Sequence, residues 1–343
     1  MKYIPLGKSG LLVSNLGLGT MVFGEEGPRG VDPESATRLI HTFLDAGGNH
    51  IDTANVYAGG RSEEIVGAAI SDRRDRVILA TKVRHATGPS LNDQGLSRYH
   101  MIRSVEASLR RLQTDVIDLL VAHVWDPLTP LEETLRALDD LVASGKVRYM
   151  GVSNFKAWQL MKALALSDAH GWSRFVAAQY QYSLVERNIE HEICELCLHE
   201  GLGLIPWGPL GGGFLSGKYQ RGDKPQDGRL AMMPDETEES WLRRSNERNW
   251  AILQVVDEVA RSRQATHSQV SLAWLLQQPG VCSVIIGART LAQLEENLAA
   301  GQLSLSEEEL ARLSQASEPN DPYPYRFLKL YGSRDPNPTY ENL

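Results

Sequence analysis

Cysteine, long apolar runs and excess positive charge are all scarce in this sequence of 343 residues. Its three cysteines cannot all pair with one another, and nothing marks an oxidising compartment. The net charge of −8 removes the electrostatic case for nucleic acid as a partner. The first residues lack the apolar core of a signal peptide, and the uncharged stretches 201–217 and 264–288 are too short or too polar to span a membrane. We therefore expect a cytoplasmic protein without nucleic-acid or membrane partners.

Arrangements of metal ligands and of phosphate-loop residues are also lacking. His191, Cys194, Cys197 and His199 lie close in sequence, but on one expected helix they cannot converge tetrahedrally on an ion. We interpret these cysteines as buried helix residues. Gly212-x-x-x-x-Gly217-Lys218 is followed by Tyr219, so the hydroxyl that would coordinate magnesium in a P-loop is missing. We expect no metal site and no nucleotide hydrolysis.

What the sequence does contain is a repeated alternation of short apolar runs and helical patterns. Residues 32–44 illustrate the helical part, because Asp32 can cap, Pro33 suits the first helical position, and apolar residues recur at helical spacing. The expected strands are 16–20, 50–54, 77–82, 118–123, 148–153, 175–179, 203–207 and 283–287. Further helices are expected near 62–71, 98–112, 130–144, 156–167, 189–200, 248–262 and 268–278. Eight buried strands with helical crossovers predict a closed (β/α)8 TIM barrel.

Three segments fall outside this alternation. The first 13 residues predict a β-hairpin that precedes the barrel. Residues 208–247 form a loop of the length that is usually functional. The aromatic-rich tail, 318–343, either folds over the barrel mouth or packs on the surface. We expect one domain over residues 1–343.

Polar and aromatic residues end nearly every expected strand, where a (β/α) barrel places its active site. They are Thr20, Asp52, Lys82, His123, Ser153 with Asn154, Gln179, Trp207 and Gly287 to Arg289. Asp52 and Lys82 end neighbouring strands and are expected to pair, since an unpaired buried charge is costly. If only these two residues are considered, the alternative is a structural ion pair at the barrel rim that has no catalytic role.

Tyr57 follows Asp52 by five residues, where a short turn can aim its hydroxyl into the mouth. A phenol is a poor acid at neutral pH, and the Lys82 ammonium would lower its pKa. Asp52 would hold Lys82 in place, and His123 could orient a substrate oxygen. Together these residues predict a general acid that protonates a developing alkoxide. Alone, Tyr57 would be a packed surface aromatic.

The sequence resembles the aldo-keto reductases. The matching stretches run in order from residue 16 to about 298 and are Leu16-Gly-Leu-Gly-Thr20, Ile51-Asp-Thr-Ala-Asn-Val-Tyr57 with Arg61-Ser-Glu-Glu, Ala80-Thr-Lys82, Asp118-Leu-Leu-Val-Ala-His123, Gly151-Val-Ser-Asn-Phe155, Gln179, Trp207-Gly-Pro-Leu210, and Gly287-Ala-Arg289 with Gln293-Leu-Glu-Glu-Asn297. Trp207 and the Leu-Ser-Gly-Lys-Tyr that follows are most similar to the bacterial and potassium-channel-β-subunit branch.

The resemblance implies a barrel that binds NADP(H) in extended form. It makes Asp52, Tyr57, Lys82 and His123 the catalytic tetrad. It assigns to the cofactor Gly19, Thr20, Met21, Asp52, Ser153, Asn154, Gln179, Trp207, Gly208, Pro209, Leu210, Gly211, Gly213, Lys218, Arg229, Gly287, Arg289, Gln293, Glu296 and Asn297. Within that set, Arg289, Lys218 and Arg229 would meet the 2′-phosphate. The candidate substrate residues are Met21, Phe23, Tyr57, His123 and Trp125.

Three functions follow as hypotheses. The first is an NADPH-dependent oxidoreductase that reduces aldehydes or ketones to alcohols, reversibly, with the proton from Tyr57. The second is a non-catalytic NADP-binding regulatory subunit; the intact tetrad favours the enzyme. The third, a metal-dependent barrel hydrolase, fails for want of ligands. The expected partner is a small carbonyl or alcohol substrate, and oligomeric assembly is left open.

Overall fold

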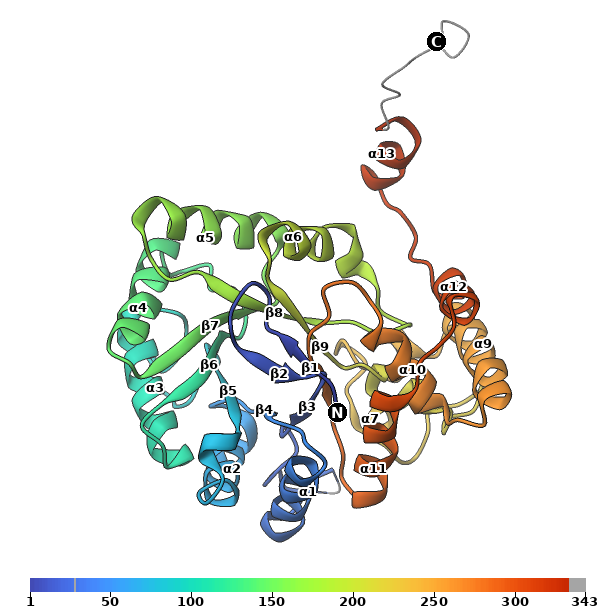
Figure 1. Cartoon of the computed structure of the whole chain (residues 1–343), viewed down its shortest axis with the longest axis horizontal. Helices are drawn as coiled ribbons and strands as arrows, with labels where there is room; N and C mark the ends of the chain where they lie inside the picture. Colours follow the sequence, from blue (N-terminus) through green and yellow to red (C-terminus); the bar gives the residue numbers. More distant parts are fainter. Residues whose placement is uncertain (28, 333–343) are drawn as a thin grey trace, which may run out of the picture.

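In the computed structural model of this chain, parallel strands curve into a barrel with helices around the outside (Figure 1). The structure describes residues 1–27 and 29–332. Over those residues the sheet holds eight strands in the order β10-β3-β4-β5-β6-β7-β8-β9. Two backbone hydrogen bonds join the ends of the sheet: the Leu204 amide in β9 donates to the Gly280 carbonyl, and the Cys282 amide, just before β10, donates to the Leu204 carbonyl. The predicted (β/α)8 barrel and its preceding hairpin are confirmed.

The strands follow the predicted positions closely. They are β1 (Tyr3–Pro5), β2 (Leu12–Ser14), β3 (Leu16–Gly19), β4 (His50–Asp52), β5 (Ile78–Val83), β6 (Ile117–Ala122), β7 (Val147–Ser153), β8 (Phe175–Gln181), β9 (Gly203–Trp207) and β10 (Val284–Ile286). β1 and β2 form the antiparallel hairpin, and neighbouring barrel strands pair in parallel.

The α-helices alternate with the strands and continue past them. They are α1 (Pro33–Asp45), α2 (Arg61–Ala69), α3 (Arg98–Leu112), α4 (Leu131–Ala143), α5 (Ala157–His170), α6 (Ile193–Glu200), α7 (Arg229–Met232), α8 (Trp241–Arg244), α9 (Glu247–Arg263), α10 (His267–Leu276), α11 (Leu291–Ala299), α12 (Glu307–Ala316) and α13 (Tyr325–Tyr331). Short 3-10 turns are η1 (Tyr57–Gly60), η2 (Arg74–Arg76), η3 (Asn188–His191), η4 (Gly211–Ser216) and η5 (Ala300–Gln302).

Local sequence explains where individual helices begin. Asp32 accepts a hydrogen bond from the Ser35 amide at 2.9 Å, and Pro33 opens α1 as expected. Helices α11 and α12 were not among the helices expected from the sequence, although each carries a start signal. Thr290 caps α11, and Ser306 forms a capping box with Glu309 in α12.

The barrel interior is a packed apolar layer rather than a pore. Its buried residues are Leu6, Val13, Ala80, Leu119, Val121, Ala177, Ile205, Cys282 and Ile285. Leu6 and Val13 come from the hairpin, so the β1–β2 unit closes the end of the barrel at which the strands begin. Gly7 makes this possible, because a β-carbon there would lie 2.4 Å from the Gly201 carbonyl oxygen.

The tail leaves the barrel on its outer side. In Figure 1, α13 stands away from the body of the molecule. Residues 318–332 do not line the cavity described below. The described part of the tail therefore does not cover the mouth, and residues 333–343 lie outside the described part of the chain.

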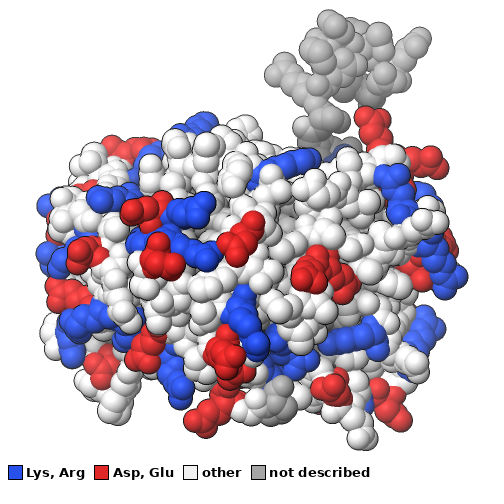
Figure 2. Space-filling model, turned by 60° about the horizontal axis from the view of Figure 1, so that its bottom comes forward, with Lys and Arg blue, Asp and Glu red and all other residues white. Residues whose placement is uncertain are grey.

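The surface carries charges of both signs. On the face drawn in Figure 2, acidic and basic side chains are interspersed rather than separated into single-sign areas. A search of the helices within 1–27 and 29–332 found none that combines the length and apolar character needed to cross a membrane.

Candidate active site

Along each strand, the side chains that point into the barrel are apolar in its interior and polar at its mouth. Successive residues of a strand point to opposite faces, so the residue two positions after an interior residue also points inward. Lys82 follows Ala80, His123 follows Val121, and Gln179 follows Ala177. Trp207 follows Ile205 in the same way. The polar strand ends singled out in the sequence are therefore brought together above one apolar floor.

Lys82 is the centre of the site and is 1% exposed. Its ammonium donates three hydrogen bonds, to Asp52 Oδ2 at 2.5 Å, to the Thr53 carbonyl at 2.7 Å and to the Tyr57 hydroxyl at 3.2 Å. All three acceptors belong to the short segment that ends β4 and begins η1. The expected ion pair between Asp52 and Lys82 is confirmed, and the tyrosine hydroxyl shares the same ammonium.

For Lys82 and for Tyr57, burial and the neighbouring opposite charge act on the pKa in opposite directions. Burial works against the charge on Lys82, but Asp52 and Tyr57 outweigh it and raise its pKa. Burial raises the pKa of Tyr57, although Lys82 acts to lower it. Lys82 therefore acts on the phenol in the expected direction, but desolvation of the phenolate is the larger effect, and the net pKa of Tyr57 is raised. The consequence is that Tyr57 holds its proton at neutral pH.

His123 lies beside Tyr57 in an apolar, cationic setting. The two rings meet edge to face with centroids 6.0 Å apart, and His85 contacts His123 in the same manner at 4.6 Å. Burial lowers the pKa of His123 to about 2, and Lys82 contributes in the same direction. The imidazole is therefore neutral and can donate one hydrogen bond without carrying charge. Sequence analysis missed His85, which lies beyond the end of β5.

A layer of amides and hydroxyls surrounds the Asp52 carboxylate. Gln179 donates to Asp52 Oδ1 at 2.8 Å, and Ser153 donates to the Gln179 carbonyl at 2.7 Å. Asn154 donates to Ser153 Oγ at 2.8 Å and to the His123 carbonyl at 3.0 Å. The ends of β4, β6, β7 and β8 are thereby held in one network.

A second network, which the sequence analysis did not predict, supports the site from α2. Ser62 is fully buried, and its hydroxyl lies 2.8 Å from Thr20 Oγ1 and 3.0 Å from Thr53 Oγ1. Thr53 also supplies the carbonyl that binds Lys82. Ser62 of the Arg61-Ser-Glu-Glu motif therefore supports the segment after β4 that binds Lys82 and presents Tyr57.

A cavity of about 700 Å³ opens above these residues and runs toward α11. It is lined by most of the residues assigned to a cofactor: Gly19, Thr20, Met21, Asp52, Ser153, Asn154, Gln179, Trp207, Gly208, Pro209, Leu210, Gly213, Lys218, Arg229, Gly287, Arg289, Gln293, Glu296 and Asn297. Tyr57 and His123 line it as well. Further lining residues, which were not assigned to cofactor or substrate from the sequence, are Val22, Arg29, Gly212, Ser216, Glu239, Ser268, Ile285, Ile286 and Ala288. Lys82 lies beneath the cavity floor.

Four residues assigned from sequence have other positions. Phe23 is fully buried in the outer core, and it does not line the cavity. Trp125 packs edge to face on Phe155 at 5.1 Å, so it too contributes packing rather than cavity wall. Gly211 is buried and does not line the cavity. His191 belongs to η3 rather than to the helix that holds Cys194 and Cys197.

The end of the cavity away from Tyr57 is cationic. Lys218 and Arg289 both line it, and burial with the nearby Arg289 charge lowers the pKa of Lys218. Gly213 has a positive φ of 89°, and a β-carbon there would press on the Lys218 side chain at 3.3 Å. A glycine backbone without a side chain, next to two cationic residues, is a suitable environment for a phosphate group.

One wall of the cavity contains an ion pair from the long loop. Arg229 Nη2 lies 2.5 Å from Glu239 Oε2, and Glu239 is 4% exposed. Arg29 reaches the same loop from the other side, where its Nη1 donates to Met233 Sδ at 3.0 Å. Residues 208–247 thus form part of the site, as their length predicted, while Glu239 was hidden in a run of charges that resembles ordinary surface.

Comparison with known proteins agrees with this geometry. The family model described as the aldo/keto reductase family matches residues 15–318. The chain belongs to the aldo/keto reductase family.

Several relatives in this family align over most of their length. A probable voltage-gated potassium channel subunit beta from Arabidopsis thaliana is 36% identical, over 88% of this chain and 91% of the relative. The uncharacterized oxidoreductase YrpG of Bacillus subtilis is 38% identical, over 92% and 95%. Norsolorinic acid reductase of Aspergillus flavus is 38% identical, over 93% and 82%. Aldo/keto reductase relatives of this chain thus include both reductases and a channel subunit.

Proposed function

We propose that this chain is an NADP(H)-dependent oxidoreductase that reduces an aldehyde or ketone to an alcohol, reversibly. The observation that carries the proposal is the Tyr57 hydroxyl, which lines the cavity and lies 3.2 Å from the buried Lys82 ammonium. A protonated phenol beside a fixed cation is suited to give a proton and to remain as a stabilised phenolate.

The cavity fits the cofactor that the family implies. Lys218 and Arg289 offer charge to phosphates, while Gln293 and Asn297 lie on α11 at the same end. Ser153, Asn154 and Gln179 offer amide and hydroxyl groups at the other end, and the Trp207 ring is available for stacking. When bound, NADPH supplies the hydride that reduces the carbonyl carbon.

The chain's own residues handle the oxygen of the substrate. Neutral His123 orients the carbonyl oxygen by donating a hydrogen bond toward it. Tyr57 transfers its proton from Oη to that oxygen, and Lys82 stabilises the phenolate that forms. Asp52 holds Lys82 through the 2.5 Å ion pair. In alcohol oxidation, the proton moves from the alcohol to Tyr57.

Replacing Tyr57→Phe tests this assignment. We expect turnover of a reactive aldehyde to fall by about 10²- to 10⁴-fold, because the proton donor is lost. The dissociation constant for NADPH, measured by fluorescence titration, should stay the same. Tyr99→Phe, at an exposed position on α3, is the matched control and should keep full turnover. Wild-type turnover in Tyr57→Phe would refute the role of Tyr57.

Replacing Arg289→Ala tests the cofactor preference. We expect the dissociation constant for NADPH to rise by about 10- to 100-fold, the usual effect of losing a charged hydrogen-bond partner. NADH, which lacks the 2′-phosphate, should be affected much less. Arg136→Ala on the outer face of α4 serves as the control. Equal weakening of NADPH and NADH would remove Arg289 from this role.

A regulatory subunit that binds NADP without catalysis is the second candidate, and the channel-subunit relative favours it. Both candidates predict NADPH binding, so binding does not distinguish them. Turnover does. A panel of aldehydes, ketones, sugars and secondary alcohols, followed by NADPH consumption or NADP reduction, supports the enzyme if any substrate turns over and the subunit if none does.

A further inference from the structure

The tail presents a cluster of large apolar side chains to solvent. Within residues 323–331 the exposed ones are Tyr323 (79%), Phe327 (54%), Leu328 (56%), Leu330 (66%) and Tyr331 (70%). Tyr323, Phe327 and Tyr331 contact one another along the segment. Scattered apolar residues are normal on a protein surface, but a contiguous group of this size marks an interaction site.

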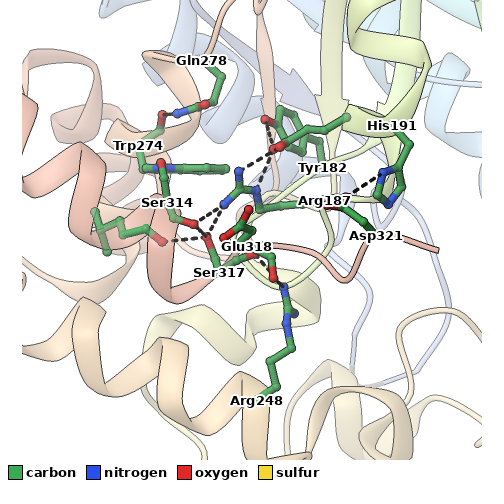
Figure 3. Close-up of polar contacts among 12 residues, drawn as sticks. Tyr182, Arg187, His191, Arg248, Trp274, Gln278, Ser314, Ser317, Glu318 and Asp321 are labelled. Carbon is green, nitrogen blue, oxygen red and sulfur yellow. Dashed lines mark hydrogen bonds and ion pairs between the residues drawn. The ribbon is translucent and has the colours of Figure 1, made fainter. Parts of the chain in front are cut away.

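The point at which the tail leaves the barrel is firmly held. In Figure 3, Arg187 donates from Nη1 to the Ser314 carbonyl at 2.6 Å and to Ser317 Oγ at 2.8 Å. Arg248 donates to the Ser317 carbonyl at 2.6 Å, and the Trp274 indole donates to Ser314 Oγ at 2.9 Å. These bonds join the end of α12 to the β8–α6 connection and to helices α9 and α10.

The base of α13 is held as well. The Tyr325 ring stacks on His191 with centroids 4.6 Å apart and an angle of 15° between the planes. His191 also lies 3.7 Å from Asp321. Lys329 forms ion pairs with Asp321 and with Glu318, inside the tail itself. The tail is therefore a defined projection from the edge of the barrel next to α6, directed away from its own barrel (Figure 1).

The barrel exposes a second apolar stripe at the same edge. Trp158, Met161 and Ala165 lie on the outer face of α5 at helical spacing, and all three are exposed. Leu198 is exposed on the neighbouring helix α6. Helices in such barrels usually face solvent with polar residues, so these exposed apolar side chains are available for contact with a partner.

The charges of the two surfaces are complementary. The segment 325–331 contains Arg326 and Lys329 and no acidic residue, and Lys329 is paired inside the tail with Asp321 and Glu318. Glu195 is exposed on α6 one turn before Leu198, while Glu192, the residue before α6, contacts Tyr325 of its own tail. The apolar helix α13 thus offers the Arg326 charge, and the exposed side of α6 offers the opposite charge of Glu195.

We propose that α13 of one molecule docks on the α5–α6 face of a second copy of this chain, and that the partner returns the same contact. Because the tail originates beside α6, a two-fold axis near that edge brings both contacts together in one closed interface. A large aromatic residue buries about 150–250 Å². Two reciprocal tails with their receiving faces therefore reach the scale of about 1,200–2,000 Å² that specific dimers bury. The proposal is independent of the proposed enzymatic function.

Sedimentation velocity of the full chain from low to high micromolar concentration tests the dimer. We expect a species of twice the 38.0 kDa monomer mass. Phe327→Asp with Leu330→Asp should weaken association by about 100-fold or more, as the loss of central interface residues does. Met161→Asp, on the receiving face, should act in the same way. Leu91→Asp with Tyr99→Asp, at exposed apolar positions near α3, adds the same charge elsewhere and should leave the dimer intact.

Circular dichroism and thermal melting will confirm that each variant is folded, so loss of the dimer will not be confused with loss of the barrel. A full chain that stays monomeric at every concentration overturns the proposal. A dimer that survives the Phe327 and Leu330 changes overturns it too. Co-sedimentation of a monomeric full chain with phosphatidylserine vesicles would assign the tail to a membrane surface instead.

Discussion

The protonation states of the side chains in the site follow from burial as much as from neighbouring charges. Lys82 keeps its charge because three acceptors surround it, while His123 is neutral because burial and the nearby Lys82 charge both lower its pKa. Tyr57 lies between them and retains its proton. At the residue scale, the site is therefore one fixed cation beside two neutral donors.

The neutral state of His123 predicts a pH profile. Since burial lowers its pKa to about 2, the imidazole does not titrate between pH 5 and 8. We expect kcat for carbonyl reduction to stay flat over that range, in initial-rate measurements with saturating NADPH. An inflection between pH 6 and 7 that disappears in His123→Asn would show instead that the imidazole carries a proton in the working enzyme.

Among the elements, the β1–β2 hairpin is held on the barrel by packing and by hydrogen bonds, such as the one from the Lys8 amide to the Gly201 carbonyl at 2.8 Å. Leu6 is fully buried at the bottom of the barrel against side chains such as Val121 and Ile205. These lie below Lys82 and His123 on the interior face, so the hairpin closes the barrel without touching the polar residues of the site.

Replacing Leu6→Ala should therefore lower stability and spare catalysis. We expect the free energy of unfolding to fall by about 2–5 kcal/mol, the usual cost of this truncation in a core. Urea denaturation measures the loss, and kcat below the transition should not change. Leu12→Ala, 53% exposed in the same hairpin, should cost far less. Similar losses of stability in both variants would contradict the assignment of Leu6 to the core at the end of the barrel.

In the described part of the chain, burial lowers the pKa of several histidines, and the largest shifts are those of His50 and His123. Burial lowers the pKa of His50 to about 4, and that of His123 to about 2. The unfolded chain takes up protons on both near pH 6.5, while the folded chain does not. The unfolded state therefore binds more protons as pH falls below 6.5, and stability decreases with it.

Acidification from pH 6.5 to 4.5 should thus raise the unfolding equilibrium constant by up to about tenfold per pH unit for each of these histidines. Urea denaturation at several pH values measures the slope. His50→Asn should make the slope shallower by about one proton, whereas His199→Asn, at an exposed position on α6, should not. An unchanged slope in His50→Asn would mean that His50 is charged in the folded protein.

The local parts of this protein were readable from its sequence. Strand and helix positions follow from apolar periodicity and caps, as at Asp32 and Pro33, and the family from motifs that keep their order along the chain. The inward direction of Asp52, Lys82, His123 and Gln179 follows from the two-residue period of strands. These features depend on neighbours in sequence, so sequence alone determines them.

Other features depend on contacts between residues far apart in the chain, and only the tertiary structure decided them. Phe23 and Trp125 are aromatic residues near strand ends, and packing places both outside the cavity lining. Glu239 is one acid in a charged run until it pairs with Arg229 in the cavity wall. The net pKa of Tyr57 also depends on such contacts, because desolvation is set by all the atoms that cover the phenol. Those atoms come from distant parts of the chain, so the spacing of residues in the sequence does not reveal the size of the effect.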